Sequence, residues 1–102
     1  MSRRVSEETK IDILMITHNR PTYARLTLRR LLDTCPPNGR VWVWDNGSDQ
    51  ETLNVISEHL NHPCLYTFHD HRDNVGLRAP TNWFWKASTA PFVGKVDDDC
   101  LV

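Results

Sequence analysis

The sequence lacks the features that mark several large classes of protein. Its 102 residues carry a net charge of -1, so no general positive field attracts nucleic acid, and we expect no nucleic-acid partner. It contains neither internal repeats nor a low-complexity segment. It has three cysteines, an odd number without framework spacing, which favours free thiols in a reducing compartment over a disulfide scaffold.

Long apolar runs are also missing. No run approaches the roughly 20 residues needed to cross a bilayer, so we expect no transmembrane segment in this chain. The opening MSRRVSEETK is basic but has no apolar core, which excludes a signal peptide. We therefore expect residues 1–9 to be a flexible leader and residues 10–102 to be one domain. The protein is expected in the cytoplasm, or at the cytoplasmic face of a membrane.

Short apolar runs alternate with amphipathic segments along the chain. The runs predict strands, and the segments between them predict helices. The predicted strands are residues 11–17, 40–47, 64–70 and 91–99, and the predicted helices are residues 21–35, 48–61 and 79–88. Strands joined by helices imply right-handed crossovers and parallel pairing. The sequence therefore predicts an α/β fold, a Rossmann-like, mainly parallel sheet with flanking helices.

Details of the first two helices follow from the same patterns. The first should begin near Pro21, whose fixed φ suits a first turn. It should bury its apolar positions, which recur near a 3.6-residue period: Tyr23, Leu26, Leu28, Leu31 and Leu32. Ser48 or Asp49 can cap the second helix, and Glu51 stands three residues after Ser48, as in a capping box.

A polar cluster follows each predicted strand. The clusters are THNR (17–20), DNGSD (45–49), DNVGLR (73–78) and DDD (97–99). A parallel sheet brings the carboxyl ends of its strands to one edge, where ligands bind near a switch in strand order. We therefore expect the four clusters to converge on one site.

The three adjacent aspartates need something to offset their mutual repulsion. On an extended strand Asp97 and Asp99 share a face, while Asp98 points to the other. Oxygen ligands favour a hard cation such as Mg²⁺ or Mn²⁺, and a carboxylate pair leaves room for substrate phosphates around it. The pattern predicts a metal site at Asp97 and Asp99 completed by a diphosphate. A solvated acidic turn is the simpler alternative.

Three other residues are candidates for ligand binding. Asp45 can accept a hydrogen bond from a ring N–H, which uracil, thymine and guanine offer; the local alternative is an Asx turn with Asn46 and Gly47. Arg78 can neutralise phosphate, or it is an ordinary surface arginine. Asn19 precedes the first helix, which it can instead cap.

Two further groups have structural explanations. The histidines and the cysteine in HLNHPCLYTFHDH straddle a helix end and a strand without Cys-x-x-Cys spacing. This favours solvent-facing histidines over a zinc site. Trp42 and Trp44 share a strand face, which favours core packing under a helix over base stacking.

Four segments, in order, resemble a family 2 glycosyltransferase with the GT-A fold over about residues 10–102. They are ILMITHNRPTYARLTLRRLL, VWVWDNGSDQET, NVGLRAPTN and FVGKVDDDCLV. DNGSDQET is close to the family's D-x-G-S-x-D-x-T signature, with one residue missing after Ser48, and the ending matches its D-x-D motif. In place of the family's small-Arg-Asn run, Arg78 and Asn82 stand four residues apart.

The resemblance implies a role for each candidate. Nucleotide-binding positions would be Thr17, Asn19, Asp45, Arg78, Asp97 and Asp98, with Asp45 at the base and Arg78 near the base or diphosphate. Asp99 and Asp97 would bind the metal, Mn²⁺ or Mg²⁺, that bridges the diphosphate. Three consecutive acids allow two registers of the motif, so Asp98 has no single role.

The implied function is metal-dependent transfer of a sugar from a nucleotide-diphosphate sugar to an acceptor hydroxyl, as in a hexosyltransferase. A UDP-sugar is favoured as donor, with GDP and dTDP open, and the acceptor is unknown. The family's catalytic base lies well after the D-x-D motif, so we expect it beyond Val102, in a part of the enzyme that these residues do not include. The chain would then be a donor-binding half, truncated after the motif, that is inactive alone.

Two alternatives to the transferase remain. One is a nucleotidyltransferase, although THNRP lacks the glycines usual after the first strand of such enzymes. The other is a non-catalytic nucleotide-binding or interaction module, in which an exposed sheet edge would favour self-association.

Overall fold

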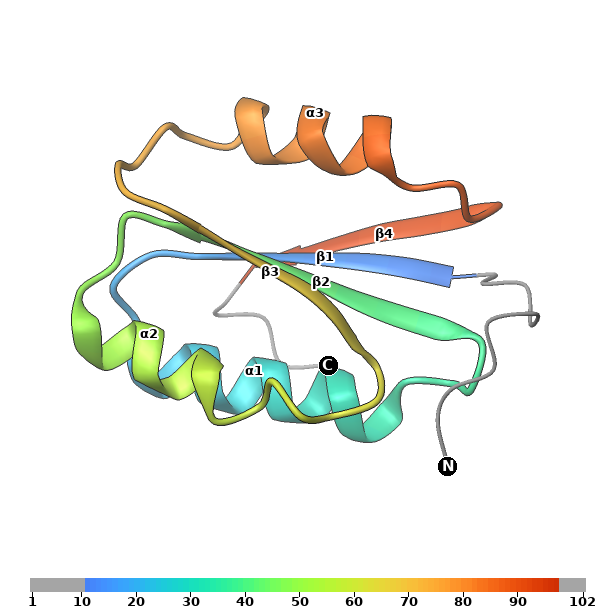
Figure 1. The fold of residues 1–102 in the computed structure, drawn as a ribbon, viewed down its shortest axis with the longest axis horizontal. Helices are drawn as coiled ribbons and strands as arrows, with labels where there is room; N and C mark the ends of the chain where they lie inside the picture. The colour runs from blue at the N-terminus through green and yellow to red at the C-terminus, as the bar shows by residue number, and fades with distance from the viewer. Residues whose placement is uncertain (1–10, 98–102) are drawn as a thin grey trace.

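The computed structural model describes residues 11–97 as four strands and three helices that alternate along the chain (Figure 1). The strands are β1 (Ile11–Thr17), β2 (Gly39–Asn46), β3 (Leu65–His71) and β4 (Phe92–Asp97), and the helices are α1 (Pro21–Thr34), α2 (Gln50–Ser57) and α3 (Arg78–Ala87). All three strand pairings are parallel. The predicted fold class is thus confirmed. The predicted leader, Asp98 and Asp99 lie outside the described residues.

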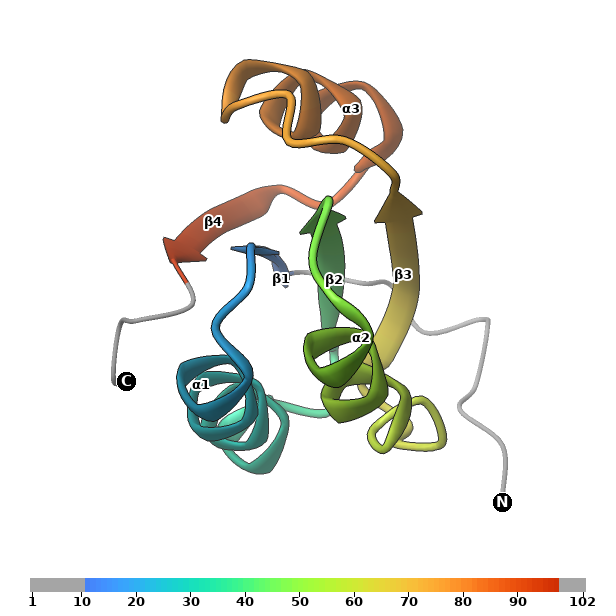
Figure 2. The ribbon, with the colours of Figure 1, turned by 90° about the vertical axis from the view of Figure 1, so that its left-hand side faces the viewer.

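The sheet changes its winding direction between β1 and β4. The strand order is β3-β2-β1-β4, so the chain moves outward from β1 to β3 and then crosses back to the far side of β1. Figure 2 shows α1 and α2 on one face of the sheet and α3 on the other. In sheets of this type ligands bind outside the carboxyl ends of the strands at such a switch. The switch here lies at the ends of β1 and β4.

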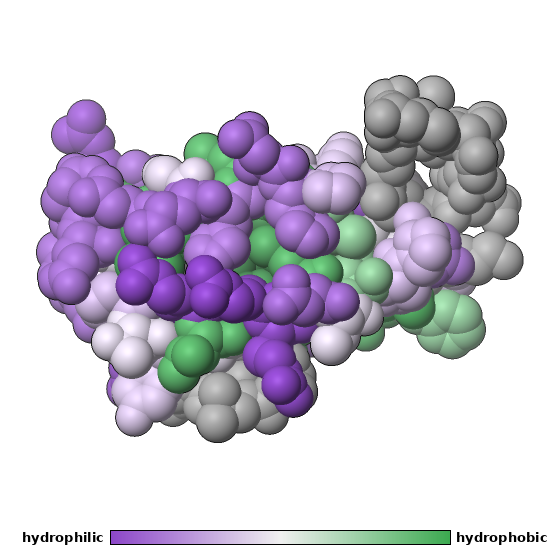
Figure 3. Space-filling model, turned by 90° about the horizontal axis from the view of Figure 1, so that it is seen from below, coloured by the Kyte–Doolittle hydropathy of each residue, from purple (hydrophilic) through white to green (hydrophobic). Residues whose placement is uncertain are grey.

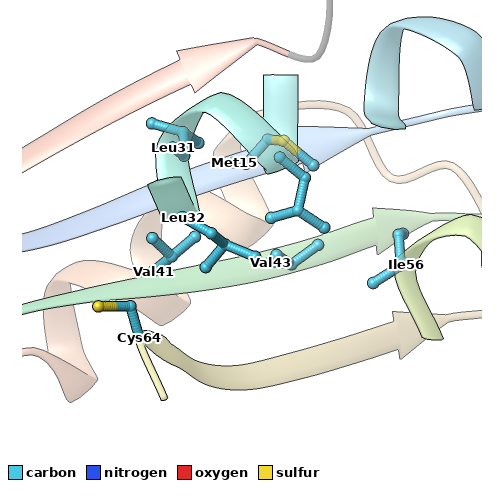
Figure 4. Packing of buried hydrophobic residues seen from close by; sticks show 8 residues of the cluster. Met15, Leu31, Leu32, Val41, Val43, Ile56 and Cys64 are labelled. Carbon is cyan, nitrogen blue, oxygen red and sulfur yellow. The ribbon is translucent and has the colours of Figure 1, made fainter. Parts of the chain in front are cut away.

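The face covered by α1 and α2 holds the larger part of the core. Met15, Val41 and Val43 pack there against Leu31, Leu32, Ile56 and Cys64 (Figure 4). The buried residues of α1 are Ala24, Thr27, Leu28, Leu31 and Leu32. The expectation that Tyr23 and Leu26 are also buried is wrong, because they are 49% and 47% exposed. At roughly 100° per residue, Tyr23 and Leu26 lie about 140° and about 160° around the helix from Leu28, outside the buried stripe.

The face covered by α3 is rich in aromatic residues. Leu14 and Ile16 of β1 lie beside Trp42 and Trp44 of β2, and Phe84 of α3 packs onto them. The rings of Trp42 and Phe84 meet edge to face, with centroids 5.2 Å apart. This confirms that the two tryptophans pack in the core under a helix.

A buried ion pair fixes the end of the sheet opposite the predicted site. Arg40 Nε and Nη2 donate to the two carboxylate oxygens of Asp12 at 2.9 and 3.1 Å, and Ser88, just after α3, also donates to Asp12. Burial of Asp12 opposes its ionisation, but the hydrogen bonds from Arg40 and Ser88 outweigh it and lower the pKa of Asp12 below 3.8. The cluster thus ties the end of α3 to β1 and β2.

The outer surface of the α1 and α2 layer is mainly hydrophilic, with apolar patches between the polar side chains (Figure 3). Within residues 11–97, no helix has the length and apolar character needed to cross a membrane.

Candidate functional site

Hydrogen bonds tie together the loops that follow β1 and β2. The parallel register places Thr17 beside Asp45 at the strand ends. The backbone N–H of Asn19 donates to Ser48 Oγ at 2.8 Å, and the N–H of Asp49 donates to Asn19 Oδ1 at 2.6 Å. The predicted convergence of the first two polar clusters is therefore present in the structure.

Asn19 bridges the two loops instead of capping α1. The residue at the N-cap of α1 is Arg20, and no side chain makes a capping hydrogen bond there. Asn19 has a φ of +50°, in the left-handed region that asparagine tolerates better than most residues. The alternative explanation of Asn19 as a helix cap is therefore wrong, and its side chain serves the contact with Asp49.

Asp49 is the residue that caps α2. Its Oδ1 accepts hydrogen bonds from the backbone N–H and the hydroxyl of Thr52 at 3.1 and 3.0 Å. The predicted capping box of Ser48 and Glu51 does not form. Ser48 lies one residue before the cap position, and its hydroxyl accepts the N–H of Asn19.

Asp45 is a wholly buried carboxylate with one unsatisfied oxygen. Its Oδ2 accepts the backbone N–H of Ser48, three residues on, at 2.9 Å. The Asx turn that was the local alternative would bond the N–H of Gly47, and it does not form, because that N–H donates to the carbonyl of His71. Its Oδ1 is buried and has no hydrogen-bond partner in the described part of the chain. Burial raises the pKa of Asp45 above 3.8; the charge of Asp70 adds to this, and hydrogen bonds from Ser48 offset only part of it. Such an oxygen is costly until a donor reaches it.

Asn46 joins three segments of the site, a role that its place in the sequence did not predict. Its Oδ1 accepts hydrogen bonds from Trp44 Nε1 at 3.2 Å and from the N–H of Val75 at 3.0 Å. Its Nδ2 donates to the carbonyl of Gly76 at 2.8 Å. Its own carbonyl accepts from His18 Nδ1 at 2.6 Å. The only signal for it in the sequence was its place inside DNGSD.

The turn at Gly47 packs directly on the loop between β3 and α3. Gly47 has a φ of +74°, and its N–H donates to the carbonyl of His71 at 2.9 Å. A Cβ at this position would lie 2.8 Å from Asn74 N and from the carbonyl carbon of Asp73. Only glycine allows this approach, which brings the third polar cluster to the first two.

Two remaining candidates lie at the same edge. Arg78 is exposed and begins α3, directly after the loop that contacts Asn46. Asp97 ends β4, and its Cα is the register partner of Ile16, one residue before Thr17. The carboxyl end of β4 therefore reaches the edge that carries the other polar clusters.

The predictions made for the end of the chain are not tested by the structure. Asp98 and Asp99 are outside the described residues, and so is Val102, beyond which we expect the catalytic base. Among residues 11–97, no three His, Cys, Asp or Glu side chains are grouped as metal ligands. The metal site and the position of the base therefore stay predictions.

Two histidines that the sequence predicted to face solvent are partly covered. His69 and His71 are half-buried and stack on Trp44, with ring centroids 4.2 and 5.1 Å from it. The expectation that they face solvent is therefore wrong. His69 Nε2 and His71 Nδ1 are 3.5 Å apart.

Comparison with known proteins places the sequence and the fold of this chain in a known family. The model of glycosyl transferase family 2 matches residues 12–102, so the chain is a member of that family. Its parallel sheet with flanking helices is that of the GT-A glycosyltransferases. No relative among curated proteins matches the chain.

Three solved structures illustrate the similarity. S. aureus TarS 1-349 is 26% identical, with a TM-score of 0.77 over 90% of this chain and 28% of that chain. The same fragment in complex with UDP-GlcNAc is 27% identical, with a TM-score of 0.75 over 88% of this chain and 26% of that one. The mannosyltransferase PcManGT from Pyrobaculum calidifontis, in complex with GDP-Man and Mn²⁺, is 19% identical, with a TM-score of 0.77 over 94% and 29%. The present chain thus spans less than a third of each.

Proposed function

We propose that this chain binds the nucleoside diphosphate of a sugar donor at the carboxyl edge of its sheet. It would serve as the donor-binding part of a metal-dependent glycosyltransferase that transfers the sugar to an acceptor hydroxyl. The observation that carries this proposal is the unpaired, buried Oδ1 of Asp45. A ring N–H would supply the missing hydrogen bond, and a bond to a charged acceptor is worth roughly 1.5–3 kcal/mol.

The hydrogen bonds of Asp45 favour uracil or thymine over guanine as the base. Oδ2 already accepts the N–H of Ser48, which leaves Oδ1 for one donor. Uracil and thymine present a single ring N–H, whereas guanine presents an N–H and an adjacent amino group that together suit two free oxygens. Between these two bases, a UDP-sugar is our favoured donor, with dTDP and GDP as the comparisons to test. TarS has been solved with UDP, at 27% identity to this chain.

A base can reach Asp45 only if the loops above it separate. Asp45 and its neighbour Thr17 are 0% and 1% exposed. The bonds from Asn19 to Ser48 and Asp49 that join the two loops are themselves exposed to solvent. Opening such contacts costs less than opening a packed core. We infer that Thr17 and Asn19 line the pocket once it is open.

The carboxylate oxygens of the acidic motif suit a divalent metal. Asp97 and Asp99 would hold Mn²⁺ or Mg²⁺, since both cations prefer oxygen ligands, and Asp98 would contact the nucleotide. β4 brings Asp97 to the switch between β1 and β4. When bound, the metal would neutralise charge on the leaving diphosphate. Arg78, which begins α3 at the same edge, would add a second positive charge for the diphosphate.

Self-association is a second candidate property. Among the described residues β4 pairs only with β1 and forms one edge of the sheet, and an unpaired edge can add another strand. Light scattering after size-exclusion chromatography would test it. A dimer that persists after Val93→Pro would contradict pairing through this edge.

Calorimetry with UDP tests the proposed function. We expect binding that requires Mn²⁺ and is lost in Asp99→Asn, with Asp33→Asn, an exposed aspartate on α1, as the matched control. We also expect the chain alone to transfer no sugar, because the catalytic base is expected beyond Val102. Metal-independent binding would contradict the role of the aspartates, whereas no binding of UDP, dTDP or GDP by folded protein would contradict the proposal itself.

A further inference from the structure

Asn46 is 3% exposed, and its hydrogen-bond partners fix the orientation of its side-chain amide. Two N–H groups, from Trp44 Nε1 and Val75, face one of its terminal atoms, and the carbonyl of Gly76 faces the other. The first atom must therefore be the oxygen and the second the nitrogen. One buried side chain thus links the end of β2 to the loop between β3 and α3.

Apart from the packing of Gly47 on Asp73 and Asn74, the described residues show little apolar burial of that loop against the sheet. Val75 and Gly76 are exposed, so little apolar burial holds them. The N–H of Gly76 bonds within the loop, to Asn74 Oδ1 at 2.9 Å. Asn46 of β2 makes hydrogen bonds to both Val75 and Gly76, and Arg78 follows two residues after Gly76. Arg78 thus begins α3 directly after the segment that Asn46 bonds.

We propose that Asn46 is a positioning residue for the diphosphate of the donor. Asn46 holds Val75 and Gly76 by its side-chain hydrogen bonds, and this places Arg78 at the edge where the diphosphate would bind. Asn46 itself touches no part of the nucleotide. This inference rests on the proposed function, because Asn46 matters for binding only if Arg78 contacts the diphosphate in that same site.

Two substitutions of Asn46 distinguish the loss of its hydrogen bonds to the loop from the effect of an added negative charge. Asn46→Asp keeps the shape and still accepts from Trp44 and Val75, but it turns a second acceptor toward the carbonyl of Gly76. Asn46→Ala removes all side-chain bonds without adding charge. Asn54→Asp is the matched control, because Asn54 is exposed on α2 and its Oδ1 only accepts from Gln50 at 2.9 Å, which a carboxylate can still do.

The readout compares UDP with uridine, which lacks the diphosphate. We expect both Asn46 variants and Arg78→Ala to weaken UDP binding roughly tenfold, while uridine binding, followed by NMR shifts, stays within about twofold. In the Arg78→Ala background, the Asn46 variants should cause no further loss. Equal losses for UDP and uridine would show a merely structural role, and independent, additive losses would overturn the proposal. If Asn46→Asp weakened UDP binding and Asn46→Ala did not, the loss would come from the added negative charge, and the positioning role would be contradicted.

Hydrogen exchange of the Val75 amide gives a measurement that needs no ligand. We expect its protection to fall at least tenfold in Asn46→Ala and to stay unchanged in Asn54→Asp; unchanged protection in Asn46→Ala would overturn the inference. If the wild type binds no nucleotide, the proposed function fails and this inference with it. If the wild type and Arg78→Ala behave as expected but the Asn46 variants do not, only this inference fails.

Discussion

Thr17 and Asp45 lie side by side at the ends of β1 and β2, and both are almost fully buried although they stand at the edge of the sheet. Strand ends of a small domain are usually solvated, so this burial needs a cause. The cause is the pair of loops tied together by Asn19, Ser48 and Asp49. The carboxylate of Asp45 is thus held in a low-dielectric position before any ligand arrives.

Asp45→Asn should leave the protein as stable as the wild type, or more stable, at pH 7. The amide can still accept the N–H of Ser48 and carries no charge to desolvate, so the cost of burying the ion disappears. Urea unfolding at pH 7 measures this. A loss of more than about 2 kcal/mol would contradict the account, because it would show that the carboxylate stabilises the fold.

The same residue has a defined pH dependence. Its pKa is raised on folding, so the native state binds more protons than the unfolded state between 3.8 and the folded value. The destabilisation by Asp45 is therefore absent below 3.8 and fully present above the folded pKa. The advantage of Asp45→Asn should shrink as the pH falls through this window. Unfolding curves at several pH values would show it, and a constant difference would contradict the raised pKa.

Gly47→Ala should destabilise the protein by roughly 1–3 kcal/mol. The added methyl would lie 2.8 Å from Asn74 N, and the φ of +74° disfavours any side chain. Gly94→Ala is the control, because nothing lies within 4 Å of its Cβ position. Urea midpoints of both variants make the test. Equal effects would mean that the turn does not pack on the loop as described.

Arg40→Leu should cost about 3–5 kcal/mol, because it leaves Asp12 buried without its cation. The lowered pKa of Asp12 means that its contribution to stability is complete above 3.8 and is lost as the pH falls through its folded pKa. The variant should therefore lose less stability than the wild type on acidification. Since this pair lies at the opposite end of the sheet, UDP affinity of the folded fraction should not change.

The sequence predicted the alternation of elements because strand runs and helix stripes have different periods, and each leaves its own pattern. It also placed Asp45, Asn19 and Arg78 at one edge, because parallel strands end together. It could not assign Asn46, whose four bonds reach Val75, Gly76 and His18 in segments distant in the chain. Nor could it show that Ala24 and Thr27, and not Tyr23 and Leu26, face the sheet, because the pattern alone does not fix the rotation of a helix.

The most direct test of the account is the affinity of UDP against that of N3-methyl-UDP, measured by calorimetry on the wild type and on Asp45→Asn. The methyl group removes the ring N–H and leaves the diphosphate intact. We predict a loss of roughly 10- to 150-fold in the wild type, the equivalent of 1.5–3 kcal/mol, and little difference in Asp45→Asn. Equal binding of the two nucleotides by the wild type would show that Asp45 does not accept the ring N–H.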